Sequence, residues 1–257
     1  MKSKSFFFFI FLLFQTILIG IEKNDCSPRI TLSLIMKNEG DRYLRRVLES
    51  AKEYITDAVI IDDGSTDNSV EICQEVLKDI PTVLIKNTSS KFANEINLRR
   101  QQWEETIKTN PDWIVILDAD EIFEHKFKDQ VLELVKDPNI DVYTFRLYDF
   151  WSETHYREDQ YWSAHFHYRP FLVRYKPGFP YLWHETPQHC GRHPYNVLNL
   201  PSKASDLRLK HYGWAIEADR KAKYERYQLL DPGAKYGWKE QYESILDSNP
   251  NLIEWKE

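Results

Sequence analysis

The chain has 257 residues, of which 42% are hydrophobic, and its formal net charge is −6 with a pI near 5.8. This length fits one domain of the larger α/β kind and allows a sizeable core. The acidic balance argues against a nucleic-acid partner, because nucleic-acid-binding proteins need a basic surface to displace counterions from phosphates. It leaves phosphate ligands open, since carboxylates can hold a divalent cation beside them. The cysteines, Cys26, Cys73 and Cys190, show no paired spacing, so neither a zinc cluster nor a disulfide framework is indicated.

The first 24 residues differ from the rest of the chain. Lys2 and Lys4 precede an apolar run over residues 6–21, which is the pattern of a secretory signal peptide. A helix of this length spans about 24 Å, short of the roughly 30 Å core of a bilayer. The segment therefore suits a cleaved signal or a short anchor, with a buried core helix as the alternative. We predict a targeting segment at 1–24, a folded domain at 25–257, and a membrane-associated or secretory location, the cytoplasmic face not being excluded.

Beyond this segment, β-forming runs alternate with helical patterns. Strands are predicted at residues 30–36, 58–61, 82–85, 113–117 and 142–148. Helices are predicted where apolar residues recur at helical spacing, around residues 44–51, 70–77, 92–107 and 215–230. Such alternation gives a mostly parallel central sheet with helices on both faces. We predict this α/β fold, with a Rossmann-like nucleotide-binding part at about 28–125 and an acceptor-side extension at about 126–257.

Acidic residues follow two of the predicted strands directly. Asp62 and Asp63 come after residues 58–61, and Asp118 and Asp120 come after residues 113–117. Ligands of open α/β sheets gather beyond the carboxyl ends of the strands, so both clusters are expected at the mouth of a site. Residues two apart on an extended chain share a face, so Asp118 and Asp120 are expected to hold one hard cation, Mn²⁺ or Mg²⁺. Such a cation would bridge the phosphates of a nucleotide diphosphate. The alternative for this pair is a solvated loop.

The segment 62–67 combines acidic and turn-forming residues. Asp67 or Thr66 is expected to stabilise the start of the following helix, because Asp and Thr commonly cap helices. Asp62 and Asp63 lie ahead of the cap, where a carboxylate can accept a hydrogen bond from a base imide or a ribose hydroxyl.

Residues 32–39, 61–67 and 113–121 together resemble glycosyltransferase family two, whose members have the GT-A fold. The resemblance implies a divalent metal at the Asp-x-Asp motif and transfer of a sugar from a nucleotide-sugar donor, most commonly a UDP-sugar. It further implies that Asp62 or Asp63 contacts the base, that Asp118 contacts the ribose or the metal, and that Asp120 binds the metal. Arg99 and Arg100 stand where the family often has a basic residue ahead of the metal motif, and Arg99 is the candidate for donor binding. The alternative for both arginines is a salt bridge on the surface of the helix.

The second half matches the family less closely. Trp183-His184-Glu185 and Lys210-His211-Tyr212-Gly213 are similar to elements that carry a catalytic base and a histidine metal ligand in many GT-A enzymes. The resemblance makes Glu185 the candidate base of an inverting enzyme and His211 a candidate metal ligand. The Glu-Asp pair usual in the family is absent, which puts the base in doubt. Ordinary structural roles are the alternatives for Glu185 and His211.

The densest aromatic segment covers residues 151–168. Its aromatic side chains can form a platform for a sugar or can cap the sheet as a core layer. The favoured function is a metal-dependent, inverting glycosyltransferase acting on a hydroxyl acceptor; whether a glycan, a lipid or a protein is left open. A catalytically silent nucleotide-sugar or carbohydrate-binding module is disfavoured by the intact carboxylates. A nucleotidyltransferase is disfavoured because residues 37–40 are poor in glycine and positive charge, and a two-carboxylate glycosidase because its acids must face each other across a bond.

Overall fold

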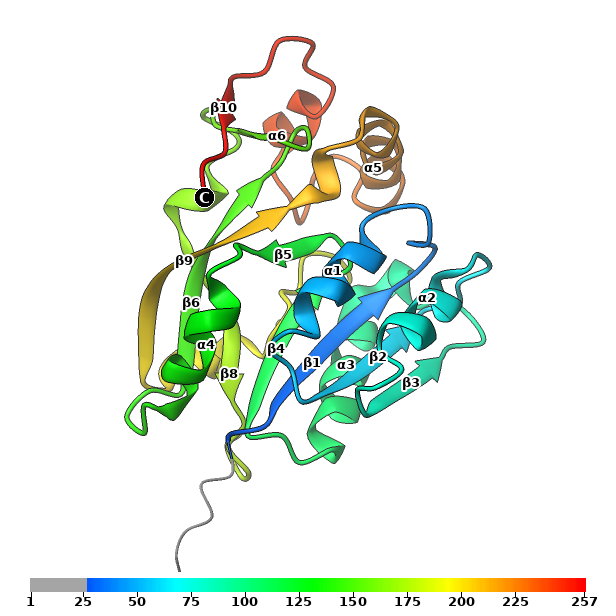
Figure 1. Ribbon diagram of the computed structural model, residues 1–257. Coiled ribbons are helices and arrows are strands. Elements are labelled where there is room, and N and C mark those ends of the chain that lie inside the picture. Colours follow the sequence, from blue (N-terminus) through cyan, green and yellow to red (C-terminus); the bar gives the residue numbers. More distant parts are fainter. Residues whose placement is uncertain (1–26) are drawn as a thin grey trace, which may run out of the picture.

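A computed structural model describes residues 27–257. An eight-stranded sheet runs through the molecule in the order β3-β2-β1-β4-β8-β6-β9-β5 (Figure 1). The strands of its first half are all parallel: β1 (Ile30–Met36), β2 (Asp57–Asp62), β3 (Thr82–Lys86) and β4 (Trp113–Asp118). The predicted α/β fold, with a parallel first half of the sheet, is therefore confirmed.

The central strands form because their residues are apolar on both faces. All of β1 and β2 is buried, and so is β4 up to Leu117, as expected for parallel strands covered on both sides. In the register, Met36 of β1 lies opposite Asp62, and Ile35 lies opposite Asp118. The acidic ends of β2 and β4 therefore flank the end of β1 at one edge of the sheet.

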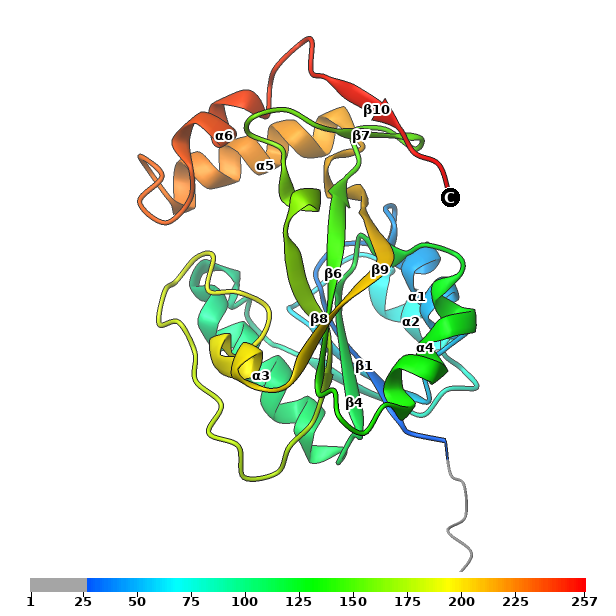
Figure 2. The same cartoon turned by 90° about the vertical axis from the view of Figure 1, so that its left-hand side faces the viewer.

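Helices cover both faces of the sheet. Figure 2 shows α3 on one side and α1, α2 and α4 on the other. The bounds are α1 (Leu44–Ala51), α2 (Ser69–Val76), α3 (Glu95–Lys108) and α4 (Phe127–Lys136). The helix predicted over 92–107 is divided, because Asn94 has the non-helical angles φ −134° and ψ 81°; a 3-10 turn, η1 (Phe92–Asn94), precedes α3.

The second half extends the sheet with strands of mixed direction. β8 pairs antiparallel with β4 and β6, β6 pairs parallel with β9, and β5 pairs antiparallel with β9. Their bounds are β5 (Glu121–Phe123), β6 (Val142–Asp149), β8 (Tyr168–Arg174) and β9 (Ser202–His211). Shorter elements are β7 (His155–Arg157), β10 (Leu252–Glu254), η2 (Ala164–Phe166), η3 (Tyr195–Asn199) and η4 (Tyr212–Trp214).

Two helices lie beyond the end of the sheet, α5 (Glu217–Leu230) and α6 (Lys239–Ser244) (Figures 1 and 2). The helix predicted from about residue 215 begins at Glu217, because the chain first makes the 3-10 turn η4. Within residues 27–257, no helix combines the length and the apolar character needed to cross a membrane. The predicted targeting segment 1–24 lies outside the described residues.

Candidate active site

A cavity of about 240 Å³ opens at the carboxyl ends of β1 and β4. The end of β1, the start of α3, the turn after β4, the loop before η3, the end of β9, and α5 all contribute to its wall. Charged side chains of both signs line it: Lys37, Glu39, Arg42, Glu95, Arg99, Asp118, Asp120, Lys223 and Arg226. The cavity also holds His189 and His211, so it brings both halves of the chain to one place.

Asp118 ends β4 between two partly buried arginines. Arg99 donates to its Oδ1 at 3.0 Å, and Arg192 lies 3.6 Å from its Oδ2. Although burial opposes ionisation, Arg99 and then Arg192 hold the pKa of Asp118 well below its usual range. Asp118 is therefore a fixed anion with two fixed cations beside it.

Glu121 organises the turn between β4 and β5. It is 1% exposed, accepts the backbone N–H of Asp118 at 2.9 Å, and forms a two-pronged ion pair with Arg192. A buried charge without its partner is costly, so Glu121 and Arg192 depend on each other. Together they fix the position of the Asp118 backbone.

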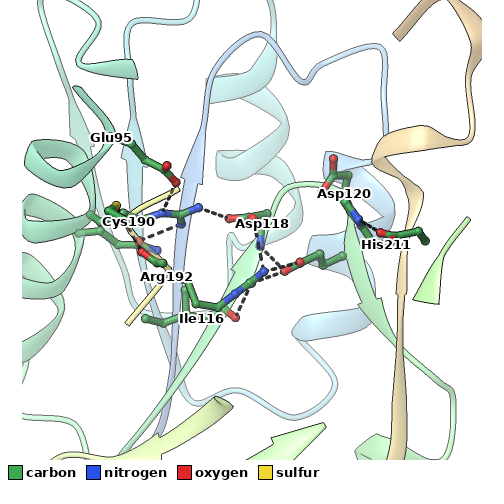
Figure 3. Close-up of polar contacts among 12 residues, drawn as sticks. Glu95, Ile116, Asp118, Asp120, Cys190, Arg192 and His211 are labelled. Atoms are coloured by element: carbon green, nitrogen blue, oxygen red, sulfur yellow. Dashed lines mark hydrogen bonds and ion pairs between the residues drawn. The ribbon is translucent and has the colours of Figure 1, made fainter. Parts of the chain in front are cut away.

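Asp120 points away from Asp118. Figure 3 shows Asp120 turned toward His211, whereas Asp118 lies on the Glu95 and Cys190 side. The predicted sharing of one face by the two carboxylates is wrong, because β4 ends at Asp118 and residues 119–120 form a turn in place of an extended strand. Asp120 Oδ1 lies 3.6 Å from His211 Nε2, and Lys223 Nζ lies 3.5 Å from Asp120 Oδ2.

His211 is held by a carboxylate on its other side. β9 lies between β6 and β5, with His211 opposite Asp149 and Glu121. Asp149 Oδ1 lies 2.7 Å from His211 Nδ1. Burial lowers the pKa of His211, but Asp120 and Asp149 outweigh it and raise that pKa above its ordinary value. Asp149 therefore orients the ring and leaves Nε2 toward Asp120.

These residues fit a divalent cation. Asp120 Oδ1 is buried without a hydrogen-bond partner, and a carboxylate oxygen with an imidazole nitrogen is a donor set that suits manganese. A metal-bound histidine commonly gives its second nitrogen to a carboxylate, as His211 does to Asp149. No group of three or more His, Cys, Asp or Glu side chains within residues 27–257 could hold an ion, so the remaining ligands would come from phosphate and water.

Asp62 and Asp63 are fully buried and do not line the cavity. Asp62 Oδ1 accepts the N–H of Ser65 at 2.8 Å, and Asp63 accepts from Ser90, Asn87 and the N–H of Lys91. Asp67 accepts the N–H of Ser69, the first residue of α2, at 3.0 Å and that of Gly40 at 2.9 Å, so it helps to hold the start of α2. The cap position itself is occupied by Asn68, which forms no side-chain capping hydrogen bond, so neither Asp67 nor Thr66 is the cap residue. The structure therefore gives Asp62 and Asp63 roles within loops, and their contact with a base stays a prediction.

Glu185 also lies outside the residues that line the cavity. Its side chain is 65% exposed and forms an ion pair with Arg100 on α3. Arg99, in contrast, contacts Asp118 inside the site. The paired arginines thus divide into one site residue and one surface residue. The placement of Glu185 gives no support to its predicted role as the base.

The structure supports the core-layer interpretation of the aromatic segment, whereas the sugar platform stays a prediction. Trp151 and Trp162 are buried with Trp214 and Tyr242 in a second hydrophobic cluster, so this part is core. Phe166 and Tyr168 are exposed. None of the aromatic residues of 151–168 lines the cavity, whereas Trp214 does.

Several site residues carry no recognisable sequence signal, namely Glu95, Asp149, His189, Arg192 and Lys223. Asp149 reaches the site only through the register of β6 and β9. Arg192 follows an irregular loop after β8. Glu39 belongs to the segment 32–39 that carries the family resemblance, but the sequence suggested no specific role for it. Burial first, and then the charge of Asp120, raise the pKa of Glu39 to about 7, although Arg42 opposes this.

Comparison with known proteins gives a family. The model of glycosyl transferase family 2 matches residues 32–190, which is more than half of the chain. Two curated relatives, the SPbeta prophage-derived glycosyltransferase SunS of Bacillus subtilis (strain 168) and glycosyltransferase SunS of Bacillus phage SPbeta, are each 30% identical over 199 residues. These matches cover 72% of this chain and 41% of each relative, so the chain spans less than half of their length.

Among solved structures, S. aureus TarS superposes with a TM-score of 0.50 and 11% identity, over 85% of this chain and 42% of that chain. At this identity the likeness concerns the fold alone, which is that of a GT-A glycosyltransferase. The family model and the relatives carry the conclusion: the chain belongs to glycosyl transferase family 2.

Proposed function

We propose that the chain transfers a sugar from a nucleoside diphosphate sugar, with a UDP-sugar as the first candidate, to a hydroxyl acceptor with inversion, and that Mn²⁺ or Mg²⁺ assists. The supporting observation is the Asp120, His211 and Asp149 arrangement at the carboxyl edge of the sheet, inside a cavity that also holds cationic side chains. A cation bound there would neutralise charge on the departing diphosphate. Asp120 and His211 would hold it.

The remaining cations of the cavity suit a diphosphate. Lys223 and Arg226 of α5 line the cavity, and so does Lys37, which directly follows β1. Lys223 lies 3.5 Å from Asp120 and has no closer carboxylate in the described part of the chain. Arg226 has no ion-pair partner among residues 27–257. A diphosphate bound between these side chains would give Arg226 an anionic partner and add one to Lys223.

An apolar part of the cavity suits the nucleoside. Ile35, Phe92 and Leu98 line it close to Arg99 and Asp118. An aromatic ring and aliphatic side chains can cover the face of a base, and an ionised Asp118 can accept hydrogen bonds from ribose hydroxyls. Membrane attachment through residues 1–24 stays a prediction, as do Asp62 and Asp63 as base contacts.

A panel of nucleotide-sugars tests the proposal. The full chain is mixed with UDP-, GDP-, TDP- and CMP-sugars with and without Mn²⁺, and donor binding and nucleotide release are measured. Manganese-dependent binding of one donor followed by release of its nucleotide is expected. Binding without any turnover, in the presence of an acceptor library, would favour the silent module. Failure of a well-folded chain to bind any donor contradicts the proposal.

A further inference from the structure

A second histidine of the cavity, His189, lies on a loop that is attached to α3. Glu95 Oε2 accepts the backbone N–H of His189 at 2.9 Å, and the N–H of Glu95 donates to the carbonyl of Pro187 at 2.8 Å. Gln188 donates to the carbonyl of Phe92 at 3.2 Å. His189 itself has φ +55°, a left-handed conformation that is uncommon for a residue with a side chain. Such strained positions persist only where surrounding contacts hold them, and they cluster at functional sites.

The ring of His189 is the first member of a hydrogen-bonded chain. Its Nε2 lies 2.5 Å from the hydroxyl of Tyr242 on α6, and that hydroxyl donates to Asp231 Oδ2 at 3.0 Å. Tyr242 and Asp231 are both buried. Asp231 also accepts the N–H groups of Tyr236 and Gly237. Burial opposes ionisation of Asp231, but the bonds from Tyr242 and these N–H groups outweigh it and lower its pKa.

The hydrogen bonds from His189 through Tyr242 to Asp231 determine the tautomer of His189. An ionised Asp231 can only accept hydrogen bonds, so the single hydroxyl proton of Tyr242 points to Asp231. The hydroxyl oxygen then has only a lone pair to offer to His189, and Nε2 must carry a proton to bond with it. In the neutral ring the other nitrogen, Nδ1, is therefore the basic one, on a residue that lines the cavity.

Neighbouring residues hold Tyr242 in the position where it contacts His189. A Cβ on Gly237 would lie 1.9 Å from the hydroxyl oxygen of Tyr242, so only glycine allows the tyrosine to occupy this position. Tyr227 stacks on Tyr242 with ring centroids 4.6 Å apart and an interplanar angle of 12°. The groups facing His189 are thus Glu95 from α3, Tyr227 from α5, Tyr242 from α6, and Asp231 behind Tyr242.

We propose that His189 is the general base of the transfer reaction, oriented by Tyr242 and Asp231; this rests on the proposed function. The acceptor hydroxyl gives its proton to Nδ1 of His189 while a lone pair of the hydroxyl oxygen forms the bond to the anomeric carbon. The bond from that carbon to the diphosphate oxygen breaks, and the nucleoside diphosphate leaves with the electron pair. The imidazolium keeps its Nε2 proton on Tyr242 and later releases the Nδ1 proton to solvent.

The test compares His189→Gln with His125→Gln, an exposed histidine outside the cavity. The probe is the nucleotide-sugar selected by the panel, with Mn²⁺, and both donor Kd and the rate of nucleotide release are measured across pH. His189→Gln is expected to lower kcat about 100-fold or more at unchanged donor Kd, and to remove one deprotonation from the pH profile. His125→Gln should match the unaltered chain.

A second measurement covers the possibility that His189→Gln does not fold. Nitrogen-15 spectra of the histidine-labelled unaltered chain should show His189 protonated at Nε2, and Tyr242→Phe should abolish that preference and lower kcat while donor Kd persists. A proton on Nδ1, or a His189→Gln rate within about threefold of normal, overturns the role of His189. Absence of donor binding by the unaltered chain is a different result, because it overturns the proposed function.

Discussion

At the scale of single residues, Glu39 shows how the cavity changes the chemistry of a carboxyl group. It follows β1 and lines the cavity, where burial and then the negative charge of Asp120 raise its pKa from 4.5 to about 7, with Arg42 opposing them. The folded protein therefore binds this proton more tightly than the unfolded chain does. Stability from Glu39 is present below pH 4.5 and is lost as the pH rises toward 7.

Replacing Glu39 by Gln should remove this loss. In the absence of divalent cations, Glu39→Gln is expected to raise the free energy of unfolding at pH 8 by up to about 3 kcal/mol, and the gain should fade toward pH 4.5. Urea unfolding at several pH values measures it. Glu133→Gln, on a carboxylate that is 76% exposed, is the control and should change stability little. An equal gain at pH 4.5 and pH 8 would contradict the account.

At the scale of elements, the junction of β9 and η4 lies against the residues of the proposed metal site. A Cβ on Gly213 would lie 2.3 Å from Lys223 Nζ, 2.5 Å from Asp120 Oδ2 and 2.6 Å from His211 Nε2. All three atoms belong to the cluster around the proposed cation. The φ angle of Gly213 is not in the left-handed region, so backbone conformation is not the reason for glycine here. The reason is that these three side-chain atoms lie too close to leave room for a Cβ.

Gly213→Ala is expected to displace Lys223 or Asp120 and to weaken manganese-dependent donor binding about 10-fold or more, while the fold remains. Calorimetric titration of donor and Mn²⁺ measures the effect. Gly178→Ala is the contrasting variant, because that position has φ +84° but no atom near the added Cβ. It should cost about 1 kcal/mol of stability and leave donor binding intact. Equal losses of binding in both variants would point to a general loss of structure.

The sequence predicts those parts of the site that follow strands directly. Asp118 and Asp120 come directly after an apolar run, so local pattern was enough to place them at the edge of the sheet. Arg99, in contrast, was suggested by the family resemblance. The direction of Asp120 was not predictable in this way, because it depends on where β4 stops and a turn begins. His211 was a candidate metal ligand only because the segment 210–213 resembles a family element.

Other site residues depend on contacts between distant segments. Asp149 meets His211 through parallel pairing of β6 with β9, and His189 meets Tyr242 across 53 residues. Glu185 was favoured because Trp183-His184-Glu185 resembles a family element, yet its side chain pairs with Arg100. The loop 175–194 has no strand or helix periodicity that would set its path, so the sequence could not place Glu185, His189 or Arg192.

At the scale of the whole molecule, one continuous sheet joins the first half of the chain to the second. β4 of the first half pairs with β8 of the second, and one hydrophobic core contains residues from Ile30 to Tyr212. Domains that share one core unfold together. If residues 25–257 form the predicted single domain, the two halves should unfold in one cooperative transition.

We expect one thermal transition. Scanning calorimetry of the chain should give equal calorimetric and van't Hoff enthalpies, and near-ultraviolet circular dichroism should change at the same temperature. Two separate transitions, with the tryptophan-rich second half melting independently, would contradict a single domain. Addition of Mn²⁺ and donor should move the single transition upward as a whole, because ligands that bind the folded state stabilise it.

The central claim is that Asp120 helps to hold a divalent cation on which donor binding depends. Calorimetric titration of the selected nucleotide-sugar with and without Mn²⁺ tests it directly in the unaltered chain, in Asp120→Ala, and in Asp79→Ala, whose carboxylate is 85% exposed. The account predicts that Asp120→Ala folds normally but loses the manganese-dependent part of donor affinity and turnover, while Asp79→Ala behaves as the unaltered chain does. Unchanged manganese dependence in a folded Asp120→Ala variant would contradict it.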